Sequence, residues 1–160
     1  MTSRGPGISR AGFTLVEALL VLVTLSIVVR IAVPNLQWLL RRARATEILG
    51  EVSRVETAAA QYMAERFRWP PDAPAGEIPP GLGSFLGEGY TFEHEGYTLD
   101  WESWELPDGL PSDPDVRALV AVTVVPATPS LEDALRGLVS GSPGWFVVGD
   151  SYTFVVEPAR

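Results

Sequence analysis

The sequence predicts an α+β protein in which one long N-terminal helix packs, through its C-terminal half, on a small antiparallel β-sheet. Three observations lead to this prediction. Residues 13–33 form an apolar run that is long enough to cross a bilayer. Residues 35–68 continue with helix-forming residues, whose apolar members recur every three to five positions. Residues 90–156 contain short segments rich in β-branched and aromatic residues, separated by glycine-containing turns.

Residues 1–12 are expected to form a short basic leader, because they contain Arg4 and Arg10 and no acidic residue. A secretory signal peptide begins in a similar way, but no small-residue cleavage site follows the apolar run here. The run instead continues past Pro34 into helix-forming sequence. We therefore interpret residues 13–34 as a transmembrane helix that the protein retains.

Three residues of this helix are candidates for a role in assembly. Glu17 places a carboxylate in an otherwise apolar segment, and such a group at membrane depth is costly, which indicates a function. Arg30 either extends its charged end to the far membrane surface or pairs with a carboxylate of a neighbouring chain. Pro34 removes one helical hydrogen bond and strains the preceding turn, so a kink is expected there.

Residues 35–68 are expected to continue the helix and to pack one apolar stripe on the sheet. The stripe consists of Ile48, Val52, Val55, Ala59, Tyr62 and Phe67. The sequence Trp-Pro-Pro at residues 69–71 ends the helix. Residues 70–89 hold five prolines and five glycines, which predicts a loop or short helical turns.

The remaining segments predict a sheet with one short helix between its strands. Residues 90–101 alternate between apolar and polar side chains, with a break at Gly96. The other expected elements are strands at 116–125, 145–148 and 152–156, a turn at 149–151 and a helix or helical turn at 131–139.

The composition excludes several classes of function for residues 69–160, the expected globular head. This part holds three arginines and 15 acidic residues, a net charge of −12, so nucleic acid is a poor partner. The chain has no cysteine, which rules out disulfides and thiolate metal sites. His94 is the one histidine, and it lies between Glu93 and Glu95, which face away from it on a strand. No convincing catalytic triad or metal set remains, so we do not expect an enzyme.

Asp108, Asp113 and Asp115 lie in one proline-rich loop and are candidate ligands for Ca²⁺, which prefers hard oxygen atoms. Their spacing matches no EF-hand loop, however, and Ser-Asp and Asp-Pro pairs are common turn formers. Turn formation and calcium binding are therefore the two readings of this loop.

Two further groups of residues are candidate contact surfaces. Trp101 and Trp104 should face opposite sides of a strand, which places one in the core and leaves the other as a possible exposed contact. Arg41, Arg42 and Arg44 follow the apolar run. They could bind lipid head groups, the acidic head, or Glu47 and Glu51 of another subunit, and the sequence does not rank these alternatives.

The string Gly-Phe-Thr-Leu-Val-Glu at residues 12–17, with its basic leader and its apolar and helical continuation, resembles the N-terminus of the type IV pilin and type II secretion pseudopilin family. The resemblance covers roughly residues 4–68. It implies cleavage between Gly12 and Phe13 by a prepilin peptidase and N-methylation of Phe13. It also implies that Glu17 acts in assembly, and that the helix around Pro34 unwinds as subunits enter a filament. Calcium in a C-terminal loop is known in major pseudopilins, which is why the aspartate loop is considered.

The resemblance further implies a structural subunit of a type II secretion pseudopilus or a type IV pilus-like filament. Its partners would be other pilin or pseudopilin subunits, the prepilin peptidase, an inner-membrane assembly platform and membrane lipid. The protein would be a single-pass protein of the inner (cytoplasmic) membrane, with its C-terminal domain outside the cytoplasm. The absence of cysteine and the small head favour a pseudopilin. The alternatives are a membrane-anchored sensor or binding protein with an acidic extracytoplasmic domain, and a tethered hydrolase.

Overall fold

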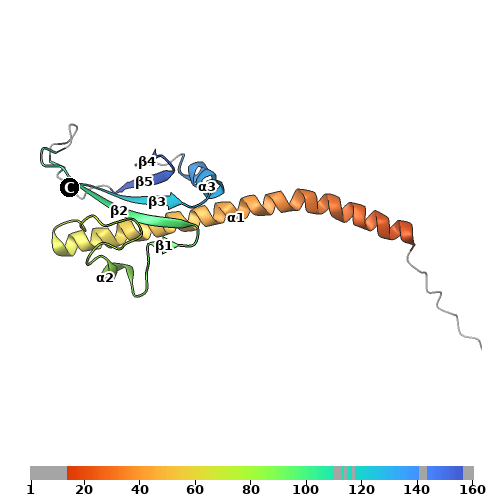
Figure 1. Cartoon of the computed structure of the whole chain (residues 1–160), viewed down its shortest axis with the longest axis horizontal. Helices are drawn as coiled ribbons and strands as arrows, with labels where there is room; N and C mark the ends of the chain where they lie inside the picture. Colours follow the sequence, from red (N-terminus) through yellow and green to blue (C-terminus); the bar gives the residue numbers. More distant parts are fainter. Residues whose placement is uncertain (1–13, 110–112, 114, 117, 141–143, 157–160) are drawn as a thin grey trace, which may run out of the picture. The chain divides into compact units, whose positions relative to one another are not determined.

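The computed structural model describes residues 14–109, 113, 115–116, 118–140 and 144–156. The chain divides into two compact units, of which the first ends at Leu39 and the second begins at Leu40. The described elements are a long N-terminal helix, a small antiparallel sheet and two shorter helices (Figure 1). This arrangement confirms the predicted α+β fold class.

Helix α1 runs from Leu15 to Arg66 and contains Pro34 without an interruption of the helix. Its first part, within the first unit, has no core of its own. The large apolar side chains there are exposed, among them Leu15, Leu22 and Ile31. By length and composition α1 is a helix that could cross a membrane, which agrees in coarse terms with the expected single-pass anchor.

The second unit is built on a five-stranded sheet with the order β1-β2-β3-β5-β4, in which every neighbouring pair is antiparallel. The strands are β1 (Glu93–His94), β2 (Tyr97–Glu105), β3 (Ala118–Pro126), β4 (Trp145–Val148) and β5 (Ser151–Val156). The expected break at Gly96 is the turn between β1 and β2, where glycine adopts a φ of +91° that other residues rarely allow. Two helices, α2 (Gly83–Leu86) and α3 (Pro129–Val139), complete the unit.

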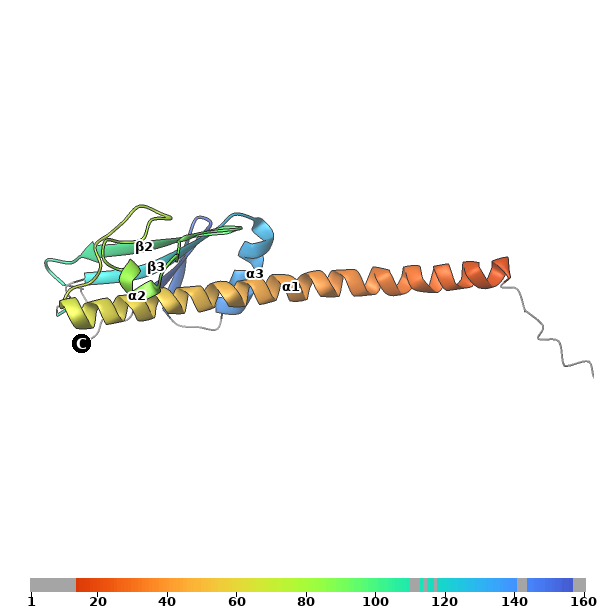
Figure 2. The ribbon, with the colours of Figure 1, turned by 90° about the horizontal axis from the view of Figure 1, so that it is seen from below.

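The part of α1 that belongs to this unit packs on one face of the sheet (Figure 2). Five of the six predicted stripe residues are buried: Ile48, Val52, Val55, Ala59 and Tyr62. The sheet contributes alternate residues of β2 and β3, and α3 adds three more apolar side chains: Tyr97, Leu99, Trp101, Val120, Val122, Val124, Leu131, Leu135 and Val139. Because each fully buried large apolar side chain contributes roughly 1.5–3 kcal/mol, this core is the main stabilising term of the unit.

Phe67, the sixth predicted stripe residue, is 86% exposed, so that part of the prediction is wrong. It is the first residue after α1 and has a φ of +56°, a left-handed conformation that ends the helix and turns the side chain away from the sheet. Trp69 takes up the contact instead, with its ring centroid 6.4 Å from that of Trp101. The Trp101 indole Nε1–H donates to the Pro70 carbonyl at 3.2 Å.

The loop at residues 70–76 covers the outer edge of β2, since β1 pairs with only two residues of that strand. The Gly76 N–H donates to the Leu99 carbonyl at 2.9 Å, and the Ser103 N–H donates to Asp72 Oδ1 at 3.2 Å. An unpaired strand edge is thereby covered within the chain.

Candidate processing and assembly site

Gly12 and Phe13, the predicted cleavage and methylation residues, lie outside the described residues. Thr14, the first described residue, directly precedes α1. The site can therefore be built from Thr14 onward, and cleavage and methylation stay predictions from the sequence.

Glu17 and Thr14 close the start of α1 by reciprocal hydrogen bonds. Thr14 Oγ1 accepts from the Glu17 N–H at 3.2 Å, and Glu17 Oε2 accepts from the Thr14 N–H at 3.3 Å. The Thr14 hydroxyl also lies 3.2 Å from Glu17 Oε2 and donates to it. This arrangement is a capping box, in which a Ser or Thr and a Glu three residues later satisfy each other's free N–H groups.

The capping box gives Glu17 a structural role that the sequence analysis missed, although its signal, Thr14 followed by Glu17 at a spacing of three, is in the sequence. It also places a carboxylate at the N-terminus of α1, where the helix dipole favours negative charge. The local cap and any pairing with another chain are two separate roles of one side chain.

The hydroxyl groups within the apolar part of α1 are satisfied by the helix itself. Thr24 Oγ1 donates to the Val21 carbonyl at 2.9 Å, and Ser26 Oγ donates to the Val23 carbonyl at 2.7 Å. These bonds lower the cost of surrounding both residues by lipid or by other apolar helices.

Pro34 and Arg30 are linked through the backbone of α1. Proline has no N–H, so the Arg30 carbonyl lacks the donor that a helix would supply from position 34. The Arg30 side chain is exposed. Neither residue interrupts the helix, so the expected weak point is a missing hydrogen bond and not a break.

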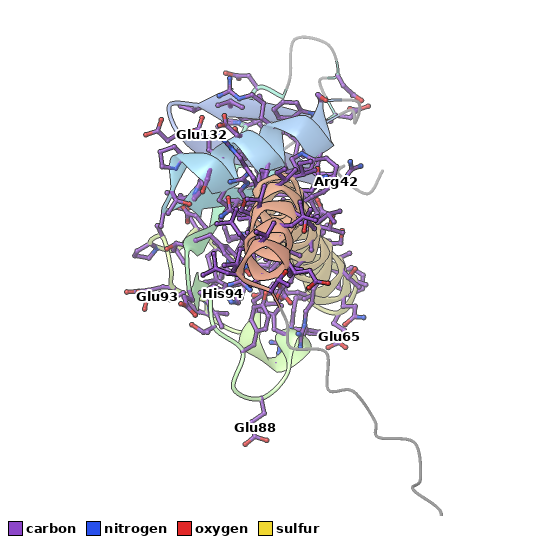
Figure 3. The ribbon with its side chains drawn as sticks, turned by 90° about the vertical axis from the view of Figure 1, so that its right-hand side faces the viewer. Arg42, Glu65, Glu88, Glu93, His94 and Glu132 are labelled. Carbon is purple, nitrogen blue, oxygen red and sulfur yellow. The ribbon has the colours of Figure 1, made fainter. Side chains whose placement is uncertain are left out.

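The three arginines that follow the apolar run differ in their surroundings. Arg44 pairs with Glu47 of α1 at 2.9 Å, and its Nη2 contacts the head by donating to the Glu95 carbonyl at 2.8 Å. Arg41 and Arg42 are exposed. Figure 3, viewed along α1, shows Arg42 on the other side of the helix from Glu93 and His94.

The aspartate loop does not gather a calcium site within the described residues. Asp113 Oδ1 accepts from the Asp115 N–H at 3.2 Å, and the Asp113 carbonyl accepts from the Val116 N–H at 3.3 Å. These bonds are those of a turn. No group of three or more metal-ligating side chains is found in the described part of the chain, so the calcium reading of Asp108, Asp113 and Asp115 gains no support.

His94 packs among aromatic rings. Its ring stacks on Tyr97 with centroids 4.6 Å apart, and the Tyr90 ring lies at 6.0 Å. Its Nε2 is buried, and the described residues supply no hydrogen-bond partner for it. Among the described residues nothing arranges His94 for acid–base work with a nucleophile.

The two tryptophans follow the prediction. Trp101 is fully buried, whereas Trp104 is 38% exposed on the opposite face of β2. Trp104 is therefore available as a contact.

Comparison with known proteins adds no assignment: no protein-family model matches the chain, and no significant match is found among curated proteins or solved structures.

Proposed function

We propose that this chain is a pilin-like structural subunit, processed by a prepilin peptidase and assembled into a type II secretion pseudopilus or a type IV pilus-like filament. One observation carries the proposal. The N-terminal part of α1 is an exposed apolar helix that has no core of its own and carries a single carboxylate, Glu17, in its first turn.

The exposed apolar surface supports this proposal on energetic grounds. Large side chains such as Leu20, Val28 and Ile31 are more than half exposed, at 63%, 61% and 64%. Leaving them in water opposes the hydrophobic effect, so lipid or other copies of the helix must cover them. A subunit that leaves the membrane to join a bundle of identical helices uses both kinds of cover in turn.

The same proposal assigns the partners. They are other subunits of the filament, the prepilin peptidase, an inner-membrane assembly platform and membrane lipid. In this proposal the leader lies in the cytoplasm and the acidic head lies outside it. The lack of cysteine and the small head favour a pseudopilin.

A membrane-anchored binding protein is the second candidate, and a specific cavity favours it. The cavity has a volume of about 1420 Å³ and lies at the C-terminal end of α1, where Tyr62, Phe67 and Trp69 form part of its wall. Cavities with aromatic walls are common ligand sites. Such a protein would keep its leader.

N-terminal mass spectrometry of protein taken from its own membranes separates the two candidates. The subunit should begin with N-methylated Phe13 and lack Arg4 and Arg10. The Gly12→Val variant should keep its leader, because a branched side chain hinders the approach of a peptidase to the backbone. A stable membrane form that begins at Met1 or Thr2 would overturn the proposal.

A further inference from the structure

The face of the sheet that points away from α1 carries a surface with no role so far. Asp100, Glu102 and Trp104 lie on it, because they alternate along β2 with the core residues Leu99 and Trp101. The register across the sheet places Phe146 and Val148 of β4 on the same face. Trp104, Phe146 and Val148 are 38%, 41% and 63% exposed, so this face is partly apolar.

A cavity of about 400 Å³ opens at one corner of this face, between β2 and the loop at residues 70–76. The loop rises on the side of β2 away from α1 (Figure 2). Three carboxylates and one indole line the cavity, together with Ser103 of β2 and three small residues of the loop: Asp72, Asp100, Glu102, Trp104, Ala73, Pro74 and Ala75. We call Asp72, Asp100 and Glu102 the acidic corner.

Two members of the acidic corner are held in place by hydrogen bonds. Asp72 Oδ1 accepts from the Ser103 N–H at 3.2 Å, and Glu102 Oε1 accepts from Thr123 Oγ1 at 2.7 Å. Asp100 Oδ1 is buried, and the described residues give it no partner. Neither the Arg44–Glu47 ion pair nor the Arg136–Glu132 ion pair reaches this corner.

The acidic corner is an electrostatically unfavourable cluster while no cation is present. The pKa of Asp100 is raised to about 6, chiefly by burial and in addition by the neighbouring carboxylates of Glu102 on β2 and Asp72 on the loop. Thr123, opposite Asp100 on β3, carries no charge. A cation in the cavity would relieve this repulsion.

The shape and chemistry of the cavity suit a guanidinium group. A planar guanidinium offers five N–H donors that match carboxylate oxygens, and it is attracted to the face of an indole such as that of Trp104. All 12 basic residues of this chain are arginines. A second copy of the chain therefore carries the complementary group.

We propose that the acidic corner and Trp104 form a docking site for Arg41 of a second copy of this chain, with Leu40 of that copy covering the exposed apolar side chains. The proposal rests on the proposed function for the reason why copies meet. Among the alternatives left open for Arg41, it selects the acidic head of another copy.

Arg41 is an arginine that the described structure leaves available for this role. Arg44, Arg54 and Arg136 bind acceptors of their own chain, at Glu47, the Leu86 carbonyl and Glu132. Arg68 shares a cavity wall with Asp113 and Asp115 of its own head. Arg41 is exposed, the described part of the chain supplies no hydrogen bond or ion pair for it, and the adjacent Leu40 is 61% exposed.

The docked arginine must come from another copy. Arg41 belongs to α1, and α1 packs on the face of the sheet opposite to the acidic corner. The sheet itself therefore separates the two groups within one chain.

Disulfide trapping tests the contact, because the chain has no cysteine of its own. Two full-length single-cysteine variants, Ala43→Cys on α1 and Ala75→Cys in the cavity wall, are produced together with different tags in the native cells. Both positions are exposed. We expect a mixed dimer in membranes or filaments. Replacing Ala43→Cys by Ala64→Cys, at an exposed position near the other end of α1, should lower the yield at least about tenfold.

Charge variants test whether arginine and carboxylate pair directly. Arg41→Glu on the Ala43→Cys copy should lower the yield by about tenfold, and Glu102→Arg on the Ala75→Cys copy should restore it. Glu102→Gln keeps an acceptor for Thr123 and removes only the charge, so a lower yield with this variant does not depend on unfolding of the head. The proposal is overturned if Arg41→Glu leaves the yield of the mixed dimer unchanged, or if Ala64→Cys gives a yield as high as that of Ala43→Cys. The proposal is also overturned if Arg41→Glu changes sedimentation with anionic lipid vesicles but leaves the yield of the mixed dimer unchanged.

The docking and the proposed function fail separately in this experiment. A cleaved, methylated protein that forms filaments without the mixed dimer removes the docking and leaves the function. A protein that keeps its leader but forms the charge-dependent dimer removes the function and leaves the docking.

Discussion

Glu17 combines a helix cap and a charge in one side chain, so a substitution that removes both cannot tell which one matters. Gln at the third helical position can still form a capping box, but it carries no charge. Thr14→Ala removes the cap and keeps the charge, at a cost of about 0.5–2 kcal/mol for the start of the helix. These two variants separate the roles.

We expect Glu17→Gln to leave processing and membrane insertion intact and to reduce incorporation into filaments as strongly as Glu17→Val does. The reason is that a carboxylate paired with the amino group of Phe13 in the next subunit cancels two charges in an apolar surrounding. Filament yield and subunit crosslinking measure the effect. Thr14→Ala is the matched control and should assemble. Normal assembly of Glu17→Gln together with failure of Thr14→Ala would assign Glu17 to the cap alone.

Phe67 holds a left-handed backbone conformation that costs other residues roughly 1–2 kcal/mol relative to glycine. Phe67→Gly removes this strain, but glycine loses about 0.5–1 kcal/mol more backbone entropy on folding. Because the side chain is 86% exposed, little packing is lost. We expect a net stabilisation of about 0.5–1 kcal/mol, measured by urea unfolding followed through tryptophan fluorescence. Phe67→Ala keeps the strain and should change little, and a marked loss of stability in both variants would show that the ring packs on the protein.

At the scale of elements, most of the fold could be predicted because the signals are local. The β-branched and aromatic residues and the glycine turn place β4 at Trp145–Val148, as expected, and β5 begins one residue earlier than predicted, at Ser151. The helix expected at 131–139 begins at Pro129, because proline is well tolerated in the first turn. Such patterns depend on neighbours in the sequence alone.

What could not be predicted depends on contacts between distant segments. Periodicity extends the stripe of α1 to Phe67, but the helix has already ended there, and the turn residue is not one of the usual glycine or asparagine signals. The acidic corner joins residues of β2 to Asp72, which lies 31 positions before Ser103, its hydrogen-bond partner. No spacing in the sequence indicates that this loop contacts β2. Cleavage, methylation and filament assembly are not properties that a single folded chain displays, so they stay predictions.

Because Pro34 supplies no N–H, we expect residues 30–36 to be the weakest stretch of α1, although the helix is continuous there. If α1 unwinds at this point during assembly, the missing hydrogen bond at the Arg30 carbonyl is the reason. Pro34→Ala should restore that bond, slow hydrogen exchange across residues 30–36 in filaments and stabilise the isolated helix by up to about 3 kcal/mol. Val33→Ala changes no backbone hydrogen bond and serves as the control. Exchange in wild-type filaments that matched the flanking turns would contradict the idea.

At the scale of the whole molecule, charge is divided between the two parts of the sequence. Residues 13–68 hold seven arginines and five glutamates, whereas the head holds three arginines and 15 acidic residues. Identical copies therefore repel through their heads and attract through contacts between the head of one copy and residues 13–68 of another. Such attraction is screened by salt, so association should weaken as ionic strength rises.

The docking site makes this association depend on pH. The ionisation of Asp100 determines whether association strengthens or weakens as the pH falls. In the free subunit the pKa of Asp100 is raised to about 6, with burial as the main cause. A guanidinium of the second copy favours the ionised carboxylate, so the docked state has the lower pKa and binds fewer protons. Association is therefore strongest above about pH 6 and weakens as the pH falls through that value, by at most about tenfold per pH unit for one proton.

Energy transfer between labelled full-length copies in vesicles, followed from pH 7.5 to pH 5, measures this pH dependence. Asp100→Asn should weaken association at pH 7.5 and remove most of the pH dependence, whereas Asp150→Asn, at the exposed turn between β4 and β5, should change neither. Association that strengthens as the pH falls from 7 to 5 in the wild-type protein would show that Asp100 does not meet a cation there.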